Sequence, residues 1–125
     1  MPGQKSPEAG VQGKTKPLCQ IHTTIRMHIP AQNRHQALTI LHPIIEMTSL
    51  DPGCISCRLY QGVKDEQALL LEQRWASEED LQRHLRSQRF HTILLVVEMA
   101  SEVPEIRFDT VSQSHGIDVV EQVRA

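Results

Sequence analysis

The chain has 125 residues, a formal net charge of -2 at pH 7, and an aromatic content of only 3%. This length suits a single domain with a modest core. The balanced charge lacks the basic patch that nucleic-acid binding requires, and the scarcity of aromatic residues argues against a stacking platform for bases. No apolar run approaches the roughly 20 residues of a membrane span. We therefore expect neither a nucleic-acid partner nor a membrane partner.

The first 18 residues carry glycine, proline, lysine, glutamine and serine but few large apolar side chains, which is typical of a flexible leader. The chain has an odd number of cysteines, Cys19, Cys54 and Cys57, and no secretion signal. Reduced thiols in the cytoplasm fit such a set better than a disulfide framework. The sequence therefore predicts a cytoplasmic protein.

A strand and a helix are predicted for the first part of the domain. Apolar and polar residues alternate from Gln20 to Ile29, which indicates a strand with one buried face. Apolar residues then recur at helical spacing from Ala37 until Asp51-Pro52-Gly53 forces a turn. Pro43 removes a backbone donor inside this helix and clashes with the carbonyl four residues earlier. We therefore expect the helix in two pieces.

A hairpin and a capped helix follow. Cys54–Gln61 and Ala68–Trp75 alternate like strands, and the residues between them form a polar loop. Ser77 can accept hydrogen bonds from free backbone N–H groups, and the three acidic residues after it suit the positive end of a helix dipole. The pattern predicts a helix that begins directly after the hairpin.

His84 is the best functional lead in the chain. Leu81, His84 and Leu85 fall on one face of the capped helix, so a titratable imidazole lies beside two leucines.

A second helical segment is predicted for about 88–99, and a fourth strand for 105–112. The order βαββαβ results. Residues 115–125 suit either a short helix or an extended arm.

Strand alternation divides the predicted sheet into two faces. The face that the helices are expected to cover carries Ile21, Ile25, Met27, Ile55, Cys57, Leu59, Leu69, Leu71, Trp75, Ile106 and Phe108. The opposite face carries Arg26, His28, Arg58, Tyr60, Glu72, Arg74, Arg107 and Asp109. This second, charged face is either the wet side of an antiparallel sheet or a polar dimer interface.

Four segments carry a resemblance to a known family: Asp-Pro-Gly-Cys at 51–54, Arg-Leu-Tyr-Gln at 58–61, the junction at 72–79, and His-Leu at 84–85 followed by Ser87 and Phe90. Over about Gln20 to Gln113 the chain resembles the antibiotic-biosynthesis-monooxygenase family. The resemblance implies a ferredoxin-like α+β fold and a homodimer whose two sheets pack as a dimeric α+β barrel. The implied domain spans residues 19–114, with an arm or short helix at 115–125.

The family includes cofactor-free quinol or polyketide oxygenases and haem-degrading enzymes, so the fold does not fix the function. In the haem-degrading members the distorting Trp falls at His84 of this chain, the iron-ligating His at Leu94, and the pocket Asn near Ile25. Leu94 cannot ligate iron, and His91 lies three residues away on a different part of the helix face. We therefore expect no haem.

Cofactor-free oxygenation needs a base that removes a proton from a quinol or phenol, so that the anion can reduce O2. His84 has the right chemistry for this base. The expected substrate-binding residues are Ile25, Leu59, Gln73, Trp75, Leu94 and Phe108, with Thr23 as a further hydrogen-bonding group. The sequence thus predicts a cofactor-independent monooxygenase for a small aromatic or quinol-type substrate, without metal or organic cofactor.

Each of these features also has a purely structural interpretation. His84 can simply be hydrogen-bonded in place, and Trp75 can be a core residue at the end of a strand. Cys54 and Cys57 form a C-x-x-C string, but residues three apart in a regular strand point to opposite faces, which argues against a thioredoxin-like site. The alternative function is a non-catalytic dimeric module that binds an apolar small molecule.

Overall fold

The computed structural model describes residues 19–125, so the leader predicted for residues 1–18 lies outside the described residues. Residues 20–110 form one compact unit. Its elements are β1 (Gln20–His28), α1 (Ala31–Thr48), β2 (Cys54–Gln61), β3 (Ala68–Trp75), α2 (Glu78–Leu85), α3 (Gln88–Val97) and β4 (Glu105–Val111). Of these, β4 runs one residue past the end of the unit.

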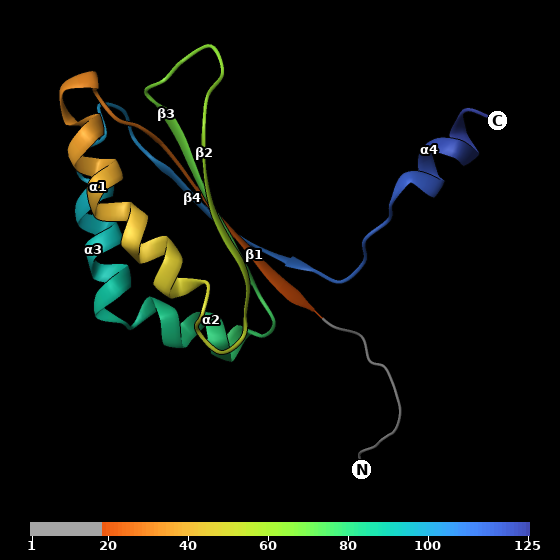
Figure 1. Ribbon diagram of the computed structural model, residues 1–125. Coiled ribbons are helices and arrows are strands. Elements are labelled where there is room, and N and C mark those ends of the chain that lie inside the picture. The colour runs from red at the N-terminus through yellow and green to blue at the C-terminus, as the bar shows by residue number, and fades with distance from the viewer. Residues whose placement is uncertain (1–18) are drawn as a thin grey trace. The chain divides into compact units, whose positions relative to one another are not determined.

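The strands form one four-stranded sheet in the order β2-β3-β1-β4. β3 lies between β2 and β1 and pairs antiparallel with both, so that Ile25 and Leu59 both lie opposite Leu71. Helices α1 and α3 cover the same side of this sheet (Figure 1). The order and the antiparallel pairing confirm the predicted ferredoxin-like α+β fold.

The core lies between the sheet and the helices. The predicted alternation in β1 is confirmed, because Ile21, Thr23, Ile25 and Met27 are buried while Arg26 is exposed. The larger of two buried clusters consists of Ile25, Met27, Ile29, Ala37, Leu41, Ile44, Cys57, Leu69, Leu71, Phe90, Ile93, Val96 and Val97. Each large aliphatic side chain buried in this way contributes about 1.5–3 kcal/mol. The core is therefore aliphatic, as the composition predicts.

Helix α1 is continuous from Ala31 to Thr48, and the prediction of two pieces is wrong. Pro43 lies inside the helix on its exposed side, and Thr39, whose carbonyl loses its backbone partner, is exposed as well. Water can therefore hydrogen-bond to this carbonyl. The apolar face of the helix stays packed in the core on both sides of the proline.

Ile55 points away from the core because β2 contains a β-bulge. Cys54 lies opposite Trp75 and Ser56 opposite Arg74, so β2 has one residue more than β3 over this stretch. Ile55 is the extra residue and is 44% exposed. The prediction that helices cover Ile55 is therefore wrong, because regular alternation does not continue through a bulge.

The same bulge brings the two cysteines of β2 to one face of the sheet. Cys54 lies opposite Trp75 and Cys57 opposite Gln73, and these two partners share a face because they are two residues apart. The prediction that Cys54 and Cys57 point to opposite faces is therefore wrong. Both are free thiols that face the helices.

The edge strand β4 is less covered than predicted. Ile106 is 37% exposed and Phe108 is 47% exposed. The prediction that helices cover both side chains is wrong within the single chain, because β4 is an edge strand and α1 lies against β2 at the opposite edge of the sheet.

The C-terminal part belongs to a second unit and contains the short helix α4 (Ile117–Val123). The structure thus decides between the two conformations predicted for residues 115–125 in favour of a helix. Ile117, Val119, Val120 and Val123 are all exposed on it. None of the helices within residues 19–125 is long and apolar enough to cross a membrane.

Candidate functional site

Two serine caps fix the backbone on either side of His84. Ser77 begins α2: its hydroxyl accepts a hydrogen bond from the Asp80 N–H at 3.2 Å and donates to the Asp80 carboxylate at 2.7 Å. Ser87 begins α3: its hydroxyl accepts from the Phe90 N–H at 3.1 Å and donates to the His84 carbonyl at 2.6 Å. His84 therefore lies at a rigid junction between two capped helices.

The imidazole of His84 is buried between aromatic rings. Its side chain is on the same face as Leu81, as predicted, and the residue is only 3% exposed. The Trp75 ring lies 4.8 Å away, centroid to centroid, at an interplanar angle of 31°, and Phe90 meets the imidazole edge-on at 5.4 Å. The ring is thus held by packing in one orientation.

A chain of polar contacts connects His84 to the buried face of the sheet. Trp75 Nε1–H donates to Gln73 Oε1 at 3.3 Å, and the Gln73 amide nitrogen lies 3.3 Å from His84 Nε2. The same amide nitrogen donates to Cys57 Sγ at 3.7 Å. Gln73 is fully buried, so each hydrogen-bonding group of its amide is used inside the protein.

Burial lowers the pKa of His84 to about 4. Arg89 acts in the same direction by charge repulsion, whereas Asp51 opposes the shift. The imidazole is therefore neutral at pH 7. Burial also raises the pKa of the Cys57 thiol and raises that of Cys54 to about 11, so both sulfurs are uncharged thiols.

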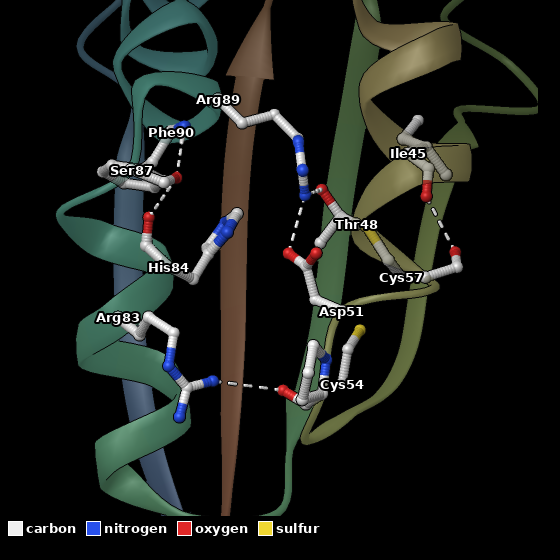
Figure 2. Close-up of polar contacts among 12 residues, drawn as sticks. Ile45, Thr48, Asp51, Cys54, Cys57, Arg83, His84, Ser87, Arg89 and Phe90 are labelled. Carbon is white, nitrogen blue, oxygen red and sulfur yellow. Dashed lines mark hydrogen bonds and ion pairs between the residues drawn. The ribbon is translucent and has the colours of Figure 1, made fainter.

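A cavity of about 180 Å³ lies beside His84. It is lined by Asp51, Pro52, Trp75, Asp80, Arg83, His84, Ser87 and Arg89. Arg89 forms an ion pair with Asp51 at 2.6 Å, and Arg83 forms one with Asp80 at 3.0 Å. Figure 2 shows the His84 ring leaning from α2 toward the Asp51–Arg89 pair. The site combines the rings of Trp75 and His84 with a charged rim that consists of Asp51, Asp80, Arg83 and Arg89.

The predicted site residues are only partly gathered at this cavity. Trp75 and His84 line it, and Gln73 reaches it through its contact with His84. Ile25 is completely buried in the core, and Leu59 and Leu94 pack against the same core cluster. Leu94 also lines a separate surface hollow of about 370 Å³ beside α3. Phe108 is exposed on β4.

Thr23 lies opposite Gln73 in the sheet and is fully buried. Its hydroxyl has no hydrogen-bond partner among residues 19–125. Thr23 is therefore a buried polar residue without a partner, next to the Gln73 amide that contacts His84.

Sequence reasoning missed the charged rim. In the sequence Asp51 is part of a turn and of the Asp-Pro-Gly-Cys segment, and Arg83 and Arg89 belong to no pattern that indicates a site. Their signal lies in the fold: the turn after α1 and the start of α3 meet beside α2, and Arg89 bridges to Asp51 and to Thr48. Spacing along the chain does not reveal such a meeting of distant segments.

A hollow of larger volume does not contain His84. It has a volume of about 400 Å³, and residues from each of the four strands line it, among them Arg26, Tyr60, Leu70 and Glu105. Its lining offers an ion pair between Arg26 and Glu105 at 3.6 Å but no buried catalytic group, so we place the site at the smaller cavity. Within residues 19–125, no three His, Cys, Asp or Glu side chains gather as a metal site.

Comparison with known proteins places the chain in a family. Residues 20–94 match the family model for the antibiotic biosynthesis monooxygenases. The chain belongs to this family. The match covers β1 through most of α3, and thus every residue that lines the His84 cavity. A comparison with curated proteins gives no match.

Solved structures share the fold. A conserved protein of Methanosarcina mazei has a TM-score of 0.68 at 22% identity, covering 74% of this chain and 92% of its own. A proposed antibiotic biosynthesis monooxygenase of Nitrosomonas europaea has a TM-score of 0.69 at 12% identity, covering 82% and 99%. A third structure, described as an antibiotic biosynthesis monooxygenase, has a TM-score of 0.67 at 15% identity, covering 74% and 99%. At these identities the likeness concerns the fold.

Proposed function

We propose that this chain is a cofactor-independent monooxygenase that acts on a small aromatic or quinol-type substrate, with His84 as its catalytic residue. The observation that carries the proposal is a neutral, buried imidazole that lines a cavity next to the Trp75 ring. Membership of the antibiotic biosynthesis monooxygenase family supports a monooxygenase-type activity. The reaction requires the oxygen anion of the substrate, which reduces O2, and His84 contacts that oxygen.

The cavity limits the size of the substrate. Its volume of about 180 Å³ is below the roughly 300–1,000 Å³ of pockets for drug-sized ligands. A substrate with a single aromatic ring fits this space. Such a ring can pack against Trp75 while its hydroxyl faces His84.

Oxygen uptake with a panel of quinols and polyphenols tests the proposal. The protein is dialysed against a chelator, and wild type is compared with His84→Ala and with His35→Ala, which removes an exposed histidine on α1. We expect uptake by wild type and His35→Ala after metal removal, and its loss in His84→Ala. No uptake by wild type across the panel contradicts the proposal. In that case, binding of a quinol without turnover would favour the non-catalytic module.

We also propose that the chain forms a homodimer through the sheet face opposite α1 and α3 (Figure 1). Arg58, Tyr60 and Arg74 are exposed on this face, and Arg58 lies opposite Glu72. A second copy would cover these groups with the same face and provide partners for Arg58 and Arg74, which form no ion pair among residues 19–125. Free thiols at Cys54 and Cys57 support a reducing, cytoplasmic location.

A further inference from the structure

The Gln73 amide has a defined orientation, because one of its neighbours can only donate. The indole N–H of Trp75 is a donor without acceptor capacity. The atom of Gln73 that lies 3.3 Å from it must therefore be the carbonyl oxygen. The amide NH2 then faces His84 Nε2 and Cys57 Sγ, with one hydrogen for each.

This orientation determines the tautomer of His84. Because the Gln73 NH2 donates to Nε2, that nitrogen accepts and carries no proton. The neutral ring therefore carries its single proton on Nδ1. Nδ1 is buried and has no hydrogen-bond partner among residues 19–125. A buried donor without an acceptor is costly, and it is satisfied when a ligand brings an oxygen.

We propose that the His84 cavity binds its phenol or quinol substrate as the oxygen anion, which accepts a hydrogen bond from His84 Nδ1–H. His84 then holds an anion that forms outside the protein, and the proton goes to the solvent. Gln73 is a positioning residue that keeps Nδ1 protonated. This inference rests on the proposed function for the identity of the substrate and replaces the base role expected from the sequence.

The opposite tautomer conflicts with the surrounding groups. As a base, His84 would offer an unprotonated Nδ1, and its Nε2–H would face the Gln73 NH2, donor against donor. Turning the Gln73 amide over would relieve this clash but would set its NH2 against the Trp75 N–H. Both arrangements leave buried donors facing each other.

The charges around His84 accommodate an anion. The titratable and charged groups that face it are Asp51 from the turn after α1, Arg89 from α3, Asp80 and Arg83 from α2, and Cys57 from β2. Each carboxylate already has an arginine partner, and the thiol is neutral. Arg89 uses Nη1 for both Asp51 and Thr48, and a guanidinium carries five N–H donors.

Proton release on binding of 4-nitrophenol tests the inference without oxygen. Calorimetric titrations are run anaerobically in buffers of different ionisation enthalpy, at a pH just below the pKa of the free phenol. If His84 binds the anion as a donor, the protonated fraction of the phenol releases its proton to the buffer. Binding without proton release would mean that His84 keeps the proton and would overturn the inference, as would the absence of binding.

Two substitutions at His84 separate a donor from a base. His84→Asn keeps an N–H donor near the position of Nδ1 but cannot take up a proton, whereas His84→Ala removes both. A hydrogen bond to a charged group corresponds to roughly a ten- to hundred-fold change in affinity. We expect that loss in His84→Ala, a loss of less than about five-fold in His84→Asn, and none in His35→Asn. Equal losses in His84→Asn and His84→Ala would contradict a donor role.

Gln73→Leu tests the positioning role. It leaves both His84 nitrogens free, so we expect proton release per bound phenol to fall below the wild-type value while the protein still binds. Unchanged proton release would show that Gln73 does not set the tautomer. Since no step of these titrations consumes O2, failure of the oxygen-uptake experiment and failure of this inference remain distinguishable.

Discussion

His84 is the residue on which the proposed function depends. Its ring is held between Trp75 and Phe90, and its Nε2 is occupied by the Gln73 amide. Packing and hydrogen bonding thus fix the ring, its tautomer and its neutral state together. The large majority of buried polar side-chain atoms have a hydrogen-bond partner, whereas Nδ1 of His84 has none within residues 19–125.

The lowered pKa of His84 makes stability depend on pH. The pKa falls from 6.5 to about 4 because burial disfavours the charged ring. Between these values the unfolded chain binds a proton that the folded chain does not, so acid favours unfolding. The contribution is intact above about pH 6.5 and is lost as the pH falls toward about 4, which amounts to about 3 kcal/mol.

Urea unfolding of wild type and His84→Asn at pH 7 and pH 4 checks this prediction. We expect the free energy of unfolding of wild type to fall by about 3 kcal/mol more than that of His84→Asn over this range. His35→Asn removes an exposed histidine and should follow wild type. Parallel pH dependence in wild type and His84→Asn would show that the His84 ring is protonated as easily when folded as when unfolded.

Gly53 is required by the turn before β2. Its φ is +83°, and a Cβ at this position would overlap the Asp80 carboxylate at the start of α2. Gly53→Ala should therefore lower the free energy of unfolding by about 2 kcal/mol or more in thermal or urea unfolding. Gly116→Ala is the matched control, because a Cβ there meets nothing closer than 3.7 Å. An equal, small effect of both substitutions would contradict this assignment.

At the level of elements, α1 tolerates a proline in its interior. Pro43 lies on the exposed side, and the helix runs unbroken past it. Pro43→Ala restores a backbone N–H and removes the clash with the preceding turn. We expect the free energy of unfolding to rise by about 2 kcal/mol.

Urea unfolding measures this gain. Gln36→Ala, an exposed position on the same helix, serves as the control and should change stability by no more than about 0.5 kcal/mol. A loss of stability in Pro43→Ala would mean that the proline stabilises the helix through the unfolded state instead.

Periodicity was sufficient to predict β1, β3, α2 and α3, because each of these elements buries one regular face. The Ser77 cap and the β2–β3 hairpin lie where the sequence places them. The bulge at Ile55 is a single extra residue that pairing with β3 reveals and alternation does not. The Asp51–Arg89 pair joins segments 38 residues apart, so it depends on how the helices pack, which no local pattern encodes.

At the level of the whole molecule, α1 and α3 of the compact unit lie on one face of the sheet and leave the opposite face for the proposed partner copy (Figure 1). We expect light scattering after size-exclusion chromatography to give twice the chain mass of 14.2 kDa. Arg58→Glu, which reverses an exposed charge on the face proposed to meet the partner copy, should shift the protein toward the monomer. Arg34→Glu on α1 changes charge away from this face and should leave the dimer intact. A wild-type mass of a single chain would contradict the proposed dimer.

The fate of O2 in the product is the decisive test of a monooxygenase that acts through His84. Dialysed, metal-free protein is incubated under ¹⁸O2 with the quinol that gives the highest oxygen uptake, and the product is analysed by mass spectrometry. We expect one ¹⁸O atom per product molecule with wild type and His35→Ala, and product at the background level with His84→Ala. A product without ¹⁸O, or equal product from His84→Ala, would contradict a monooxygenase that acts through His84.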